Sequence, residues 1–289
     1  MEGELEKPDW IKVRYAKNSA VEAIKKDLEG KGLATVCQES LCPNISECWG
    51  GGTATFLLMG DTCTRGCRFC FVTKSGKPPP LNPGEPNKLL ESIRRMDVTY
   101  AVLTSVDRDD LVDQGSSHLA RCISHLKDKM PGLRIEILIP DFRGEKELLR
   151  NIVDASPEVI AHNIEVVERL TPDVRDRRAG YRQSLDVLRN VKELDSSIYT
   201  KSSIMVGLGE TKEEMLQAMD DLRSVGVDFL TIGQYLRPSH RQLAVKEYVP
   251  LETFKYYEQV AKEKGFKYVA SGPFVRSSYK AGELFEVSV

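Results

Sequence analysis

The 289-residue sequence predicts an α/β fold, a partial (β/α)6 TIM-like barrel with an extension at each end. Six short runs of apolar and β-branched residues are typical of strands, and stretches with helical periodicity separate them. A strand and a helix recur at intervals of tens of residues, as they do in right-handed βαβ units with a parallel sheet. Six units fall short of the eight that close a barrel, so the partial barrel is favoured and a doubly wound open sheet is the alternative.

The expected strands have nearly continuous apolar sequence, as strands covered on both faces do. They span residues 53–61, 98–106, 134–141, 159–165, 199–208 and 229–236. Amphipathic helices are expected over 115–130, 182–194, 211–225 and 251–264, with a further helix over 19–30. Thr211 and Glu214 match a capping box, and Gly226 and Gly265 are the expected helix stops. The prolines of residues 74–86 predict a loop.

This order of elements predicts three parts of the chain. Residues 1–52 form an N-terminal extension with a Cys/Gly-rich segment, residues 53–265 form the partial barrel, and residues 266–289 form a C-terminal extension.

The charge balance excludes a class of partner. The 41 Lys and Arg face 43 Asp and Glu, which gives a net charge of −2 and no basic excess of the kind that nucleic-acid binders carry. No apolar run is long enough for a membrane helix, and the acidic start has no signal-peptide character. We therefore expect no nucleic-acid partner, no membrane association and a reducing cytoplasmic location.

The seven cysteines are informative in that setting. Their number is odd and six of them fall in one N-terminal window, so metal binding is favoured over a disulfide framework. Cys63, Cys67 and Cys70 form a C-x3-C-x2-C run just after the first expected strand. Three thiolates can bind three irons of a 4Fe–4S cluster and leave the fourth iron open to a substrate. The alternative is zinc, which usually needs a second cysteine pair or nearby histidine.

A second triad precedes the first. Cys37, Cys42 and Cys48 stand among polar, turn-forming residues, which favours a second cluster over buried apolar cysteines. Its fourth iron needs a ligand from elsewhere in the chain. Cys122 falls on the apolar face of an expected helix and is interpreted as a buried thiol, and no histidine is assigned to a metal.

The first triad resembles the motif of the radical S-adenosylmethionine superfamily, with Phe69 at the aromatic position. Along nearly the whole chain, the sequence resembles the lipoyl synthase family. The matching segments are CPNISECW, GDTCTRGCRFC, LTSVDRDDL, AHNIEVVERL, MVGLGET, QYLRPS and SGPFVRSSY.

The resemblance implies a sulfurtransferase with two 4Fe–4S clusters and S-adenosylmethionine. The Cys63–Cys70 cluster would generate a 5′-deoxyadenosyl radical. The auxiliary Cys37–Cys48 cluster would give up the sulfur inserted at carbons 6 and 8 of a protein-bound octanoyl-lysine. The fourth ligand of the auxiliary cluster is carried over to Ser278, with Ser277 as the alternative, and Arg276 belongs to the same R-S-S-Y motif. A hard oxygen ligand would be the weak point of a soft thiolate site.

The resemblance also suggests contacts to S-adenosylmethionine. A segment that ends the second expected strand would face the methionine moiety, a pair near the end of the fourth would face the ribose, and a G-x-G turn would approach the adenosine. These residues are Thr104, Ser105 and Asp107; Asn163 and Glu165; and Gly207, Gly209 and Glu210. The alternatives are an ion-pair loop at Asp107–Asp110 and a plain helix-leading turn at Gly207. Lys201 is left open between pairing with a carboxylate and ending its strand in solvent.

The implied partners are an octanoylated lipoyl-carrier domain of the dehydrogenase E2 or glycine cleavage H protein type, a ferredoxin- or flavodoxin-type electron donor, and an iron–sulfur carrier for cluster repair. Three rival functions stay open: another radical enzyme with an auxiliary cluster, a two-cluster ferredoxin-like electron carrier, and a zinc-stabilised binding module.

Overall fold

The computed structural model describes residues 5–11, 34–35, 55–96, 98–279 and 281–282. Its main feature is an eight-stranded sheet whose strands follow the order β1-β2-β5-β6-β7-β8-β9-β10. β1 is antiparallel to β2, and the strands from β2 to β10 are parallel. The strands are β1 (Ala34–Thr35), β2 (Thr55–Leu58), β5 (Tyr100–Ser105), β6 (Arg134–Leu138), β7 (Val159–Ala161), β8 (Tyr199–Val206), β9 (Phe229–Gln234) and β10 (Tyr268–Gly272).

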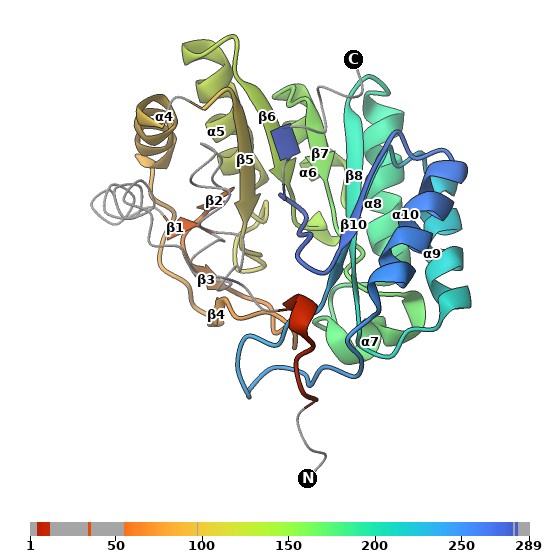
Figure 1. Ribbon diagram of the computed structural model, residues 1–289. Coiled ribbons are helices and arrows are strands. Elements are labelled where there is room, and N and C mark those ends of the chain that lie inside the picture. The colour runs from red at the N-terminus through yellow and green to blue at the C-terminus, as the bar shows by residue number, and fades with distance from the viewer. Residues whose placement is uncertain (1–4, 12–33, 36–54, 97, 280, 283–289) are drawn as a thin grey trace.

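The strands form a curved wall, and the helices cover its outer side (Figure 1). Among the described strands, β1 and β10 are the two edges and do not pair with each other. The α/β class and the partial barrel are therefore confirmed, and the six expected strands are all present. The boundaries of the three expected parts of the chain stay a prediction.

One parallel strand was not expected. β10 pairs with β9 over five residues, from Tyr268↔Phe229 to Gly272↔Gly233, inside the predicted C-terminal extension. Of its five residues, Val269 alone is fully buried. An edge strand that is half exposed lacks the continuous apolar run that revealed the six interior strands.

The helices that follow the strands agree with the expected periodicity. α5 (Ser116–Lys129), α8 (Tyr181–Leu194), α9 (Lys212–Ser224) and α10 (Leu251–Glu263) match the four expected ranges within two residues at either end. The capping box at Thr211 and Glu214 is confirmed. The expected helix over 19–30 lies outside the described residues.

Several helical segments were missed. They are α4 (Glu85–Arg95), α6 (Lys146–Asp154), α7 (Thr171–Val174), and the short 3-10 segments η1 (Asp9–Ile11), η2 (Phe142–Gly144) and η3 (Glu168–Leu170). α4 begins at the end of the proline-rich loop, with Pro86 in its first turn. Proline is tolerated there because the first backbone N–H groups of a helix have no partner within it.

Two apolar clusters lie between the sheet and the helices. One is built on β2, β5 and β6 beneath α4, α5 and α6, and the other on β8 and β9 beneath α8, α9 and α10. In the described part of the chain, no helix combines the length and apolar character needed to cross a membrane. This packing fixes the strands, so that their carboxyl ends meet at the lower edge in Figure 1.

Candidate active site

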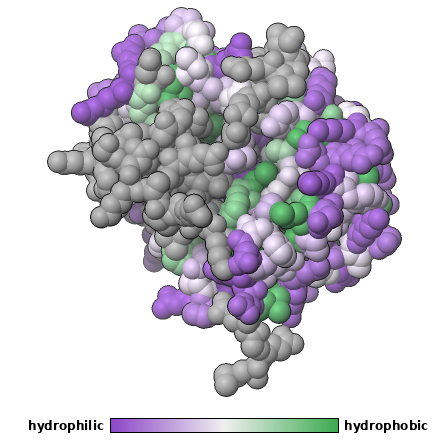
Figure 2. Space-filling view, in the orientation of Figure 1, coloured by the Kyte–Doolittle hydropathy of each residue, from purple (hydrophilic) through white to green (hydrophobic). Residues whose placement is uncertain are grey.

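A cavity of about 560 Å³ opens at the carboxyl ends of the parallel strands. Its volume lies within the range of small-molecule sites, and this end of the sheet is where α/β proteins place their chemistry. In Figure 2, apolar side chains show in the middle of the face, and hydrophilic side chains cover the helices on the right. The wall is formed by the cysteine segment, the strand ends, the segment after β9 and the C-terminal segment.

The cysteine segment is held at both ends. β3 (Thr62–Cys63) and β4 (Thr73–Lys74) form a two-stranded parallel sheet that closes the loop between them. The middle of the loop is anchored by Arg68, whose N–H donates to Val174 O at 2.8 Å and whose carbonyl accepts from Leu243 N at 3.2 Å. The backbone therefore places all three thiols of the C-x3-C-x2-C run on the cavity wall.

Each of the three sulfur atoms has a backbone N–H close to it. Cys63 Sγ accepts from Arg65 N at 3.4 Å, Cys67 Sγ from Asp176 N at 3.3 Å, and Cys70 from the backbone of Val72. Three soft sulfur donors with backbone N–H groups directed at them fit an iron–sulfur cluster, whose sulfurs are stabilised by such hydrogen bonds.

Burial determines the state of these thiols in the metal-free chain. It raises the pKa of Cys63 to about 12, with a further contribution from the charge of Asp107. It raises the pKa of Cys67 to about 11 and also raises that of Cys70. The thiols are therefore protonated without metal, and a bound metal would have to displace their protons.

Arg65, inside the cysteine loop, joins the loop to two strand ends. Its side chain is 3% exposed and its guanidinium donates to both oxygens of Asp141, at 2.5 and 2.7 Å. It also donates to Asp109 at 3.0 Å and lies 3.3 Å from Asp107. A rigid guanidinium fork suits such paired carboxylates, so this buried network fixes the loop against β5 and β6.

Five of the predicted cofactor contacts meet at this cavity. Thr104, Ser105, Asp107, Asn163 and Glu165 all line it, together with Phe69 of the cysteine run. Their convergence follows from the parallel sheet, in which the carboxyl ends of neighbouring strands share one edge.

Two atoms in this group are unsatisfied. Ser105 Oγ and Asn163 Oδ1 are buried and have no hydrogen-bond partner within the described ranges. Because buried polar atoms are nearly always paired, these two are expected to receive partners from a ligand. Asn163 Nδ2 donates to Glu165 Oε1 at 3.1 Å, and Glu165 has a left-handed φ of 67°. Such backbone strain in a residue other than glycine is concentrated at functional sites.

Two carboxylates of the cavity wall, those of Asp107 and Glu165, are partly buried. Burial raises the pKa of Asp107 to about 6, although Arg65 opposes this rise. Burial also raises the pKa of Glu165, which Arg175 opposes. A cationic ligand beside these carboxylates would recover part of the cost of burying them.

The predicted G-x-G turn is not at this cavity. Gly207, Gly209 and Glu210 are absent from its wall. The Glu210 carboxylate accepts from the N–H groups of Gly207 and Leu208, at 2.5 and 3.0 Å. A Cβ on Gly207 would lie 2.1 Å from Gln234 Nε2, so the turn is packed against its own neighbours. The structure supports the helix-leading turn, and a contact with adenosine stays a prediction.

The C-terminal motif reaches the same cavity. Arg276, Ser277 and Ser278 line it. They are far from the cysteine segment in the sequence, but both segments line the same cavity. The segment lies directly on β9, because a Cβ on Gly233 would stand 2.1 Å from Val275 O. Cys37, Cys42 and Cys48 lie outside the described residues, so a link between them and Ser278 stays a prediction.

Several residues of the wall were missed by sequence reasoning. Asp141 and Gln234 stand at the ends of expected strands, and that position could have identified them. His162 and Arg175 are buried and share Ser184 Oγ, which lies 2.9 Å from His162 Nε2 and from Arg175 Nη1. No local sequence pattern indicates this contact.

Lys201 pairs with a carboxylate and does not end its strand in solvent. Its ammonium group is fully buried and lies 2.7 Å from Glu136 Oε1, and Tyr100 donates to the other oxygen of Glu136 at 2.9 Å. Cys122 is fully buried in the apolar core, as expected.

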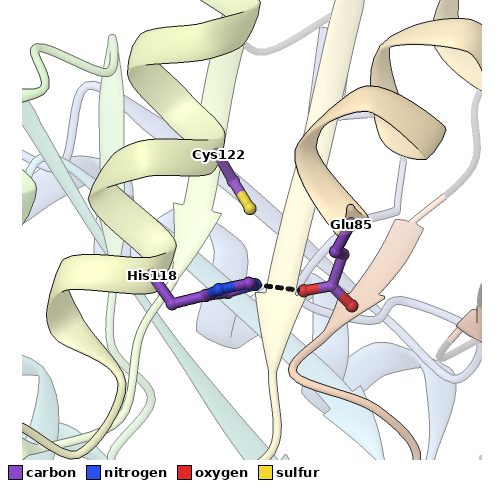
Figure 3. A group of neighbouring side chains, drawn as sticks. All are labelled: Glu85, His118 and Cys122. Atoms are coloured by element: carbon purple, nitrogen blue, oxygen red, sulfur yellow. Dashed lines mark hydrogen bonds and ion pairs between the residues drawn. The ribbon is translucent and has the colours of Figure 1, made fainter. Parts of the chain in front are cut away.

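A buried group of Glu85, His118 and Cys122 has metal-ligand chemistry (Figure 3). Arg121 donates to His118 Nδ1 at 2.8 Å, so the proton is on Nε2, which donates to Glu85 Oε2 at 2.6 Å. Two ligand atoms about 2.0 Å from a tetrahedral zinc would be about 3.3 Å apart, so 2.6 Å indicates a hydrogen bond. Glu85 also accepts the N–H of Met59 at 3.0 Å. The group therefore ties α4 and α5 to the exit of β2.

Comparison with known proteins identifies the family. Residues 57–222 match the model of the radical SAM superfamily. Lipoyl synthase from Myxococcus xanthus is 54% identical over 279 residues, which cover 96% of this chain and 93% of that protein. The chain belongs to the lipoyl synthase family.

Other members agree with this assignment. The mitochondrial lipoyl synthase of Aedes aegypti is 55% identical over 99% of this chain and 74% of its own length. The chain spans about half (53%) of the apicoplast lipoyl synthase of Toxoplasma gondii, at 53% identity. As a radical SAM enzyme, a member of this family uses a 4Fe–4S cluster and S-adenosylmethionine.

Solved structures confirm the fold of this lipoyl synthase family member. The FeFe-hydrogenase maturase HydG from Carboxydothermus hydrogenoformans superposes with a TM-score of 0.60, at 13% identity, over 93% of this chain and 69% of that one. Methylornithine synthase superposes with a TM-score of 0.54, at 10% identity, over 88% and 78%.

Proposed function

We propose that this chain is a lipoyl synthase that inserts two sulfur atoms, at carbons 6 and 8, into an octanoyl chain held on a lysine of a carrier protein. The observation that carries the proposal is the shared cavity. It brings the cysteines of the C-x3-C-x2-C run, the polar strand ends and the serines of the C-terminal motif to one wall.

Cys63, Cys67 and Cys70 would hold the 4Fe–4S cluster. When bound, the cluster and S-adenosylmethionine supply a 5′-deoxyadenosyl radical that removes hydrogen from the alkyl chain. S-adenosylmethionine carries a sulfonium and an ammonium group, which suit the carboxylates of Asp107 and Glu165 on the same wall. The unsatisfied Ser105 Oγ and Asn163 Oδ1 would complete its hydrogen bonds.

Cys37, Cys42 and Cys48, with Ser278 as fourth ligand, would hold the auxiliary cluster that supplies sulfur. The position of Ser278 in the cavity wall supports this role, and Ser277 is the alternative. Arg276 acts as a positioning residue, since its Nη1 donates to the carbonyls of Val275 and Pro273 at 2.7 and 3.3 Å. These bonds fold the segment into the turn that presents the serines.

The remaining wall would orient the substrate. Ile139, Met205, Leu236 and Val275 give the cavity an apolar lining that suits an alkyl chain. Carbons 6 and 8 differ little in reactivity, so their selection has to come from positioning. The proposed partners are the octanoylated carrier domain, a ferredoxin- or flavodoxin-type electron donor and an iron–sulfur carrier, and the proposed location is the cytoplasm.

The test is anaerobic reaction of the reduced enzyme with S-adenosylmethionine and an octanoyl-lysine peptide, followed by mass spectrometry. The expected product gains two sulfur atoms. Cys63→Ala should form neither 5′-deoxyadenosine nor product, Cys37→Ala should form 5′-deoxyadenosine without product, and Cys122→Ala serves as the control that retains both.

The rivals give other results. If wild-type protein forms 5′-deoxyadenosine and leaves the peptide unchanged, the chain is another kind of radical enzyme. If it forms no 5′-deoxyadenosine, a radical function of any kind is excluded, and an electron carrier or zinc module is left.

A further inference from the structure

Two segments of this chain are basic and contain no acidic residue. Residues 62–84 hold four Lys and Arg, and residues 235–246 hold three more, with no Asp or Glu in either segment. This distribution is unusual in a chain whose 43 acidic residues outnumber its 41 basic ones. We call the two segments together the basic border.

The two segments meet in space beside the cysteines. Leu243 N donates to Arg68 O at 3.2 Å, and Gln242 Nε2 donates to Cys70 O at 3.3 Å. Both segments also line the cavity, the first with Phe71 and Lys74 and the second with Leu236, Arg237 and Pro238. Because Phe71 is 39% exposed and lines the cavity as well, the basic border includes part of the cavity mouth.

Most cations of the basic border lie at the protein surface. Arg68, Lys74, Lys77 and Arg241 are exposed. Arg68, Lys74 and Arg237 donate to backbone carbonyls, those of Asp173, of Cys67, and of Gln242 and His240 respectively. In the described residues, none of these three cations forms an ion pair with a carboxylate. Arg65 differs from these three cations, since it is buried among aspartates.

Two other segments beside the cavity have a different pattern of charge. In residues 173–178, Asp173 and Asp176 stand among three arginines, and Asp176 pairs with Arg178 at 2.8 Å. In residues 107–113, the carboxylates of Asp109 and Asp110 pair with Arg65 and Arg108. The basic border is therefore a cationic part of the mouth that a large partner can use for orientation, although Lys7, Arg175 and Arg276 also line the cavity.

We infer that the basic border binds acidic side chains flanking the octanoylated lysine of the carrier protein. The inference rests on the proposed function, in which the alkyl chain enters the cavity while its lysine stays attached to a protein. The carrier surface next to that lysine then has to lie against the mouth. Acidic residues there would pair with the exposed cations and set the direction from which the chain enters.

The test uses three synthetic peptides of equal length, in which octanoyl-lysine is flanked by Glu, by Gln or by Lys. Sulfur insertion by the holoenzyme is measured for each as kcat/KM at low and at high salt. Binding of the same peptides is measured separately by fluorescence anisotropy, so that the charge preference is obtained even without turnover. We expect the Glu-flanked peptide to exceed the Lys-flanked one by about tenfold at low salt, and the gap to shrink at high salt.

Charge reversal identifies the surface. Lys77→Glu/Arg241→Glu should remove or reverse this preference and leave kcat for the Gln-flanked peptide unchanged. Lys255→Glu/Lys262→Glu, which makes the same change of charge on the outer helix α10, is the control and should keep the preference.

Two results would overturn the inference: equal binding and turnover of the three peptides by wild-type enzyme, or an equal loss of preference in both double variants. Failure of the proposed function is a separate result, because wild-type enzyme would then add sulfur to none of the peptides whatever their charge.

Discussion

Removal of the Arg65 side chain should destabilise the protein far more than removal of an exposed arginine. Asp141, its main partner, is 1% exposed, and the two side chains make two hydrogen bonds of 2.5 and 2.7 Å. Burial opposes ionisation of Asp141, but the bonds from Arg65 outweigh it and hold the pKa of Asp141 below its usual value. Arg65→Leu leaves this buried carboxylate without its cation, which costs about 3–5 kcal/mol.

The matched control is Arg182→Leu. Arg182 pairs with Glu168 at 2.7 Å, but these side chains are 64% and 52% exposed. Solvent screens such a pair, so the control should lose less than about 1 kcal/mol. The assay is anaerobic urea unfolding at pH 7, with the iron content of each variant measured alongside. The double variant Arg65→Leu/Asp141→Asn should recover part of the loss, because the uncompensated charge is then removed.

The reasoning would be refuted if Arg65→Leu and Arg182→Leu cost the same. It would also be refuted if Arg65→Leu were strongly destabilising and the added Asp141→Asn recovered nothing, since the loss would then not arise from a buried charge.

Two further variants test the packing of the sheet. Gly233→Ala places a Cβ 2.1 Å from Val275 O, so it should cost about 1–3 kcal/mol in thermal unfolding, whereas Gly76→Ala, with no atom within 4 Å of its Cβ, should cost little. Equal effects of the two would exclude the close approach of the C-terminal segment. Burial opposes ionisation of Asp228, but hydrogen bonds, first among them that from Lys192, lower its pKa. Asp228→Asn should therefore cost about 1–3 kcal/mol at pH 7, and the difference from wild type should narrow as the pH falls below about 4, where the unfolded carboxyl takes up its proton. A difference that grows on acidification would contradict this assignment.

Much of the fold could be predicted because a strand whose two faces are both buried has a recognisable apolar sequence. The six interior strands are continuous apolar runs, and the helices beside them carry one apolar face. β10 has Val269 as its one fully buried residue, so neither an apolar run nor strict alternation indicates it. Its partner is fixed by the completed sheet and cannot be inferred from its own five residues.

Some residues of the site could be predicted from local sequence, and others depend on contacts with distant segments. Ser105 and Asn163 could be predicted because they stand where parallel strands end, and such ends meet at one edge. The role of Arg65 could not be predicted because its main partner, Asp141, lies 76 residues away, at the end of another strand. Gly207 also stands in a turn after a strand, but the space beside its Cα is occupied by the side chain of Gln234. Local patterns indicate where a chain turns, and the packing decides which turns face the cavity.

The central claim is that the chain holds two iron–sulfur clusters, one on Cys63, Cys67 and Cys70 and the other on Cys37, Cys42 and Cys48. The direct measurement is the iron and sulfide content of strictly anaerobic protein, compared between wild type, Cys63→Ala and Cys37→Ala. We expect about eight irons in wild type and about four in each variant. A wild-type content of about four irons that Cys37→Ala leaves unchanged would remove the sulfur donor and contradict the proposed function.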